Sequence, residues 1–180
     1  MIGALLGRLA RDTRGVSLIE FAISLPFLIL LFTGSFQLSD AVAANRKVTM
    51  ATRTIADLTS QYTAVSDSDL DTILNASQQV LAPYSADAAT MTVTLVKTDA
   101  LSRSTVAWSD GKNTTGLRPC SAFNLPLAIK QAGTSMIVAQ VVYKYKPTFG
   151  TTYIGMIPLT ETIIMSPRGS TTITYSGPSC

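Results

Sequence analysis

RGVSLIEFAISLPFLILLFTGSFQL, residues 14–38, contains an apolar run, residues 16–38, that is long enough to span a membrane as a helix. Three arginines lie on its N-terminal side, at Arg8, Arg11 and Arg14, and one carboxylate, Glu20, lies near its start. A lone glutamate costs about 2.5–3.5 kcal/mol at the centre of a spanning helix and less near an end. A plain anchor or a secretory signal does not need this carboxylate, so the run indicates a further role.

The charges around the run predict its orientation. Residues 1–15 contain three arginines and one aspartate, and we expect them to form a short cytoplasmic leader. The positive-inside rule then places the N-terminus in the cytoplasm, residues 16–38 in the membrane and residues 39–180 on its far side. A local break or kink is expected at Pro26.

An ordinary signal peptide is the alternative interpretation of the same segment. Ala41-Val42-Ala43 fits a small-x-small cleavage site. Asp40 lies beside that site, however, and Glu20 and Pro26 interrupt the apolar core that signal peptidase substrates require. The N-terminal residue of the mature protein distinguishes the two interpretations.

The composition narrows the class of function. The net charge of +3 on 180 residues does not predict a nucleic-acid surface, since the chain has no basic cluster beyond the leader. The sequence contains no histidine, which removes Ser-His-Asp catalysis and histidine metal sites. It also has no paired carboxylates at a recognisable catalytic spacing, so we expect no enzyme and no cofactor. The acidic residues of 67–71 resemble the start of a calcium loop but lack its glycine and its distal glutamate, so we expect no metal site.

The two cysteines, Cys120 and Cys180, are expected to form one disulfide in an exported domain, and two unpaired thiols are the alternative. Closing a loop of about 60 residues stabilises a fold by roughly 4 kcal/mol in the chain-entropy model.

The patterning downstream predicts an α+β fold. A helical period continues past the membrane run, and Ser66 is expected to cap a second helix. From Met91 the period changes to two, which is typical of strands, and a turn is expected at 110–113. The predicted order is a small antiparallel sheet after two helical stretches. The apolar stripe of the first stretch is expected to include Leu38, Ala41, Asn45, Val48, Thr52, Ile55, Leu58 and Tyr62. The expected elements are a helix continuation over 39–63, a helix over 67–82, and strands over about 90–97, 104–109, 136–146, 159–166 and 171–175.

The start of the apolar run contains the residues of a processing site. A protease acting at the cytoplasmic face needs a small residue before the bond, and Gly15 provides one. Cleavage there leaves Val16 as the new N-terminus and makes Glu20 the fifth residue. In a filament of staggered helices, this carboxylate can pair with the amine of a neighbouring subunit.

The block RGVSLIEFAISLP resembles the class III signal of type IV pilin-like proteins, and more closely the TadE-like pseudopilins of tight-adherence (Tad) pilus systems. The resemblance implies a small single-pass protein that a prepilin peptidase cleaves after Gly15, with Glu20 and Phe21 used in recognition and assembly. Val16 differs from the Phe or Met common in ordinary type IV pilins, which favours a minor pilin or pseudopilin.

The implied partners are the prepilin peptidase, the major pilin, other minor pilins or pseudopilins, the inner-membrane pilus platform and the membrane itself. The implied function is the assembly, initiation or tip of a Tad-type pilus, and through it adhesion. A membrane-anchored periplasmic adaptor without a filament role is the alternative.

Overall fold

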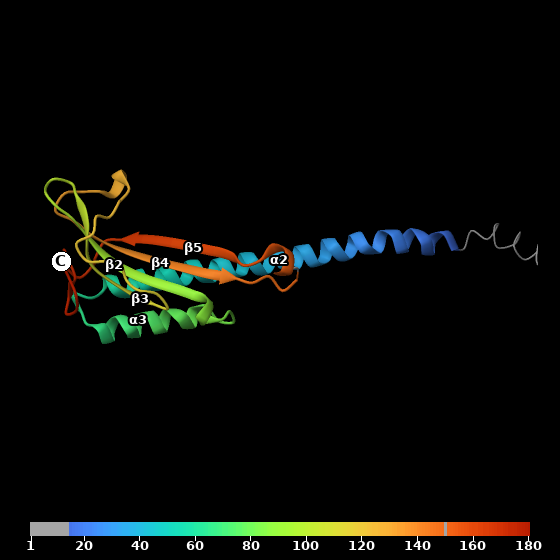
Figure 1. Ribbon diagram of the computed structural model, residues 1–180, viewed down its shortest axis with the longest axis horizontal. Helices are drawn as coiled ribbons and strands as arrows, with labels where there is room; N and C mark the ends of the chain where they lie inside the picture. The colour runs from blue at the N-terminus through green and yellow to red at the C-terminus, as the bar shows by residue number, and fades with distance from the viewer. Residues whose placement is uncertain (1–14, 150) are drawn as a thin grey trace, which may run out of the picture. The chain divides into compact units, whose positions relative to one another are not determined.

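The computed structural model describes residues 15–149 and 151–180 and shows an α+β protein. A long N-terminal helix, α2 (Val16–Ser60), is followed by a second helix, α3 (Asp67–Val80), and then by an antiparallel sheet (Figure 1). The predicted fold class is therefore confirmed. The chain forms two compact units, residues 1–40 and 41–180, and the second is called the domain below. The α2 helix is continuous through Pro26, so the expected break does not occur.

Within the domain, α2 buries a narrow stripe of mostly small side chains. Ala44, Ala51 and Ala56 are almost inaccessible to solvent, and Val48 and Ile55 lie on the same face. These positions recur every three or four residues, as one face of a helix requires. The sequence prediction placed Asn45 and Tyr62 in this stripe, which is wrong, because both are exposed. Small residues adjoin the sheet instead, since they let the helix backbone approach it closely.

The α3 helix begins at a complete capping box. The Ser66 hydroxyl accepts a hydrogen bond from the Asp69 N–H, and the Asp69 carboxylate accepts one from the Ser66 N–H at 2.9 Å. Both groups satisfy backbone donors that a helix start otherwise leaves unpaired. The helix then directs Leu70, Ile73 and Leu74 into the core, and it ends at Val80.

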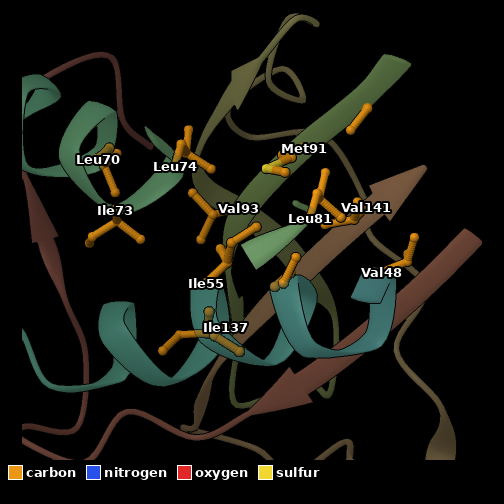
Figure 2. Packing of buried hydrophobic residues seen from close by; sticks show 14 of the residues in the cluster. Val48, Ile55, Leu70, Ile73, Leu74, Leu81, Met91, Val93, Ile137 and Val141 are labelled. Carbon is orange, nitrogen blue, oxygen red and sulfur yellow. The ribbon is translucent and has the colours of Figure 1, made fainter. Parts of the chain in front are cut away.

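A four-stranded antiparallel sheet in the order β3-β2-β4-β5 lies against both helices. Its strands are β2 (Ala89–Thr98), β3 (Ser104–Lys112), β4 (Ser135–Tyr145) and β5 (Ile157–Met165). One face of β4 is buried throughout: Ile137, Ala139, Val141, Tyr143 and Tyr145. On the other face Gln140 and Lys144 are exposed, whereas Val138 is buried in a second, smaller cluster with Val96 and Leu125. Figure 2 shows Ile55 and Val48 of α2 packing in the same cluster as Ile137 and Val141 of β4. A 3-10 turn at Ala86–Ala88 leads from α3 into β2. A second 3-10 turn at Leu127–Ile129 lies between β3 and β4, and α4 (Thr151–Ile154) lies between β4 and β5.

Two strand predictions need correction. The β3 strand does not end at residue 109, because Asp110 and Gly111 continue the ladder opposite Val93 and Thr92 of β2. The turn begins only at Asn113, which has a φ of 57°. The last strand is also much shorter than the expected 171–175: β6 (Thr174–Tyr175) pairs in parallel with β1 (Ala64–Val65), outside the main sheet.

The C-terminal segment is fixed to the domain by several long-range contacts. Cys120 and Cys180 form a disulfide that joins residues 60 positions apart. The Trp108 indole N–H donates to the Ile173 carbonyl at 3.0 Å, and its ring lies 5.3 Å from that of Tyr175. Trp108 is only 1% exposed, so it belongs to the core.

Candidate functional site

The first part of α2, residues 16–38, has an almost entirely exposed apolar surface. No residue of its most apolar 18-residue window is buried, and the mean hydropathy of that window is 2.2. By length and composition, α2 is the one helix among the described residues that is able to cross a membrane. Exposed apolar surface of this extent marks a membrane or protein contact. The segment is therefore consistent with a single-pass membrane anchor.

The polar side chains inside this segment are partly satisfied by the helix itself. The Thr33 hydroxyl donates to the Ile29 carbonyl at 2.8 Å, which removes an unpaired donor from an apolar environment. Glu20 has no such arrangement: among residues 15–149 and 151–180, no cation forms an ion pair with it. Its carboxylate is exposed on the second turn of the helix.

Gly15 and Val16 lie at the start of α2. Gly15 directly precedes α2 and is exposed, and Val16 is the first residue of the helix. No atom lies within 4 Å of the position that a Cβ on Gly15 would occupy, so this residue is open on its side-chain side. Phe21, next to Glu20, is also exposed. The leader arginines Arg8, Arg11 and Arg14, which the sequence analysis assigns to membrane orientation, lie outside the described residues.

The domain carries an open groove between α2 and the edge strand β5. Its volume is about 890 Å³. Arg168 and Asp57, which both line the groove, form a salt bridge of 2.9 Å. The groove has both apolar and charged lining, and it was not predicted from the sequence, because it depends on which strand ends the sheet. The lining residues are Thr49, Met50, Arg53, Thr54, Asp57, Leu58, Val80, Glu161, Ile163, Met165 and Arg168.

The acidic residues at the start of α3 each have a structural partner. Hydrogen bonds from the Ser66 side chain and backbone lower the pKa of the Asp69 carboxyl. Asp67 accepts a hydrogen bond from the Tyr175 hydroxyl, and Asp71 lies 3.9 Å from the Lys112 ammonium. Burial, together with the hydrogen bond to Asp67, raises the pKa of Tyr175. Within the part of the chain that the structure describes, no three His, Cys, Asp or Glu side chains are grouped to hold a metal ion.

Comparison with family models finds a match, which covers most of the N-terminal helix. Residues 15–57 match the model described as TadE-like protein. This segment of the chain is TadE-like. The match begins at Gly15, includes Val16, Glu20 and the whole apolar run, and ends three residues before the end of α2. The resemblance read from the sequence is thus confirmed over these residues.

The TadE-like match concerns the helix and leaves the rest of the domain unassigned. Comparisons with curated proteins and with solved structures give no significant match to the chain. The TadE-like match associates the chain with Tad pili. The α3 helix and the sheet lie outside the matched residues, and their surfaces must be interpreted from their own geometry.

Proposed function

We propose that this chain is a pseudopilin or minor pilin that contributes to the assembly, initiation or tip of a Tad-type pilus, and through it to surface attachment. A prepilin peptidase cleaves it after Gly15, and Val16 becomes the mature N-terminus. The observation that carries the proposal is the Gly15–Glu20 spacing at the start of an exposed apolar helix, inside a TadE-like segment.

The position of Glu20 explains why a charged residue is tolerated in this segment. Residues 16–38 span about 34 Å as a helix, slightly more than the hydrocarbon core of a bilayer. Glu20 lies about 6 Å along the axis from Val16, close to the cytoplasmic interface, where the cost of a carboxylate is lower than at the centre. On leaving the membrane, Glu20 pairs with the Val16 amine of a neighbouring subunit, and this ion pair sets the stagger between helices.

The proposed topology follows from the same residues. The leader remains in the cytoplasm, where the peptidase acts, and the domain lies in the periplasm. The partners are the peptidase, the inner-membrane pilus platform, the major pilin and other minor pilins or pseudopilins. No catalytic chemistry is assigned to the domain.

Mass spectrometry of the mature N-terminus tests the processing step. The wild-type protein is expected to begin at Val16, and a Gly15→Leu variant is expected to retain the leader. A mature protein that starts at Ala44 or Asn45 would identify ordinary signal peptidase instead. An intact Met1 in the wild type would favour the alternative function, a membrane-anchored adaptor that binds its partner through the groove beside β5.

Substitution of Glu20 tests the assembly step. Glu20→Ala is expected to leave membrane insertion intact, because it makes the segment more apolar, and to lower the amount of pilus. Ser24→Ala, which removes a polar group but no charge one turn further along the same helix, serves as the control. Unchanged piliation in Glu20→Ala would show that the carboxylate has no role in assembly.

A further inference from the structure

Apolar and basic side chains gather at the connection between β4 and β5. Phe149 is 51% exposed, Met156 63% and Ile157 39%. Lys144 and Lys146, at the end of β4, are also exposed. Exposed aromatic and long aliphatic side chains beside lysines are the composition of protein surfaces that contact the membrane interface.

The direction of β4 places this connection at the end of the domain where α2 enters it. In Figure 2, Ile55 and Val48 of α2 follow the same order across the picture as Ile137 and Val141 of β4, so strand and helix run in opposite directions. From Val141 to Tyr145 the strand rises about 13 Å. In a helix the same rise takes about nine residues, so the end of β4 lies close to the N-terminal end of the part of α2 that belongs to the domain. Figure 1 shows the β4–β5 connection at this end.

The chain then limits how far this end lies from the bilayer. Ala41 follows Leu38, the last residue of the spanning segment, by only three residues, so at most about 11 Å separate them. The headgroup layer extends several Å beyond the hydrocarbon core, and interfacial side chains enter it by about 5–10 Å. We therefore propose that Phe149, Met156 and Ile157 insert into the headgroup layer of the membrane that residues 16–38 span, while Lys144 and Lys146 bind anionic lipid headgroups. The inference rests on the membrane-spanning part of the proposed function.

The charges at this end of the domain suit an anionic surface. Arg46 and Lys47 follow Ala41 on α2 and add two cations to those of Lys144 and Lys146. Two acids belong to the same end: Asp87, which is exposed in the connection before β2, and Asp40, which directly precedes Ala41. Cations are therefore in excess, and each lysine near an anionic leaflet adds favourable attraction. The contact would fix the orientation of the domain on the membrane before the subunit enters a filament.

Tryptophan quenching by brominated lipids tests the contact in the full chain. The wild type has a single tryptophan, Trp108, which is buried and supplies a constant background. Phe149→Trp places a conservative reporter in the connection. Leu127→Trp is the matched control, because Leu127 is 88% exposed in the turn before β4, at the other end of that strand. Both variants are reconstituted into phosphatidylcholine–phosphatidylglycerol vesicles whose acyl chains are brominated near the glycerol.

Several-fold stronger quenching is expected for Phe149→Trp than for Leu127→Trp. A third variant, Phe27→Trp, is reconstituted into vesicles whose acyl chains are brominated near their methyl ends, because residue 27 is the midpoint of residues 16–38. It reports on the spanning segment itself and separates the membrane anchor from the membrane contact of the domain. Quenching of Phe27→Trp without quenching of Phe149→Trp would overturn the membrane contact and leave the anchor intact. Absence of quenching in Phe27→Trp would overturn the spanning segment and the contact together.

The lysine contribution is measured in the Phe149→Trp background. Lys144→Gln with Lys146→Gln is expected to reduce quenching in vesicles that contain phosphatidylglycerol to the level seen with phosphatidylcholine alone. Equal quenching with and without phosphatidylglycerol in the parent variant would show that the lysines do not bind anionic headgroups.

Discussion

Removal of the disulfide is the perturbation whose magnitude the structure defines most directly. The bond between Cys120 and Cys180 joins residues 60 positions apart, and Cys180 is the last residue of the chain. Cys180→Ser opens this loop and restores conformational entropy to the unfolded chain. For a loop of this length the chain-entropy model gives a loss of about 4 kcal/mol in the free energy of unfolding.

Urea unfolding of the full chain in detergent micelles measures this loss, with Trp108 fluorescence as the signal. Trp108 is 1% exposed and contacts Tyr175 and Ile173, so its emission reports on the part of the core next to the disulfide. With a denaturant slope of about 2 kcal/mol per molar urea, the midpoint is expected to fall by about 2 M.

Three controls make the measurement decisive. Cys120→Ser is expected to give the same loss as Cys180→Ser, and the double variant no further loss, because all three remove one bond. Reductant is expected to bring the wild type to the variant midpoint. Ser179→Ala, next to the bond, is expected to change little. An unchanged midpoint in Cys180→Ser, or a double variant that loses the sum of both single effects, would refute the reasoning.

Three further predictions concern the domain. Ile55→Ala is expected to lower the free energy of unfolding by about 2–5 kcal/mol, because Ile55 is fully buried, whereas Leu127→Ala at an exposed position should change it by less than about 0.5 kcal/mol. Trp108→Phe leaves the Ile173 carbonyl without its indole donor and is expected to lower the same free energy by about 1–3 kcal/mol, measured by circular dichroism during urea unfolding. The pKa of Asp69 is lowered in the folded state, so its contribution to stability is present above the unfolded pKa of about 3.9 and is lost as the pH falls through the folded value. The urea concentration at the unfolding midpoint is therefore expected to decrease when the pH is lowered below about 4. An Asp69→Asn variant should show a smaller decrease over the same pH range. An equal decrease in both proteins would contradict the assignment.

Local patterns predicted much of the fold because they act over a few residues. The Ser66 cap with Asp69 three positions later is a contact within one helical turn, and the structure has it as expected. The alternation along β4 also gives its buried face directly, since successive side chains of a strand point to opposite sides. The apolar stripe of α2 was less well predicted. Asn45 fits the helical spacing, but the buried position belongs to its neighbour Ala44, and only the packing of helix on sheet distinguishes the two.

The candidate functional site likewise has residues that the sequence predicted and surfaces that it did not predict. Gly15, Val16, Glu20 and Phe21 are defined by spacing along one helix, and the family match includes all four. The roles of these residues in processing and assembly remain predictions, which the N-terminal and piliation measurements test. The groove beside β5 and the basic, apolar connection after β4 required the sheet order, which no local pattern reveals.

The sequence by itself determined the apolar segment that is able to cross a membrane, because hydropathy and length depend only on composition along one helix. It also determined the two helices and the main strands, because their periods are local. Only the tertiary structure decided that β5 ends the sheet, that β1 pairs in parallel with β6, and that β3 continues to Lys112. Two-residue strands have no period to detect, and their pairing joins Ala64 to Thr174 across most of the domain. Such contacts form only when the rest of the fold brings their backbones together, so their position is a property of the packed domain and not of either segment.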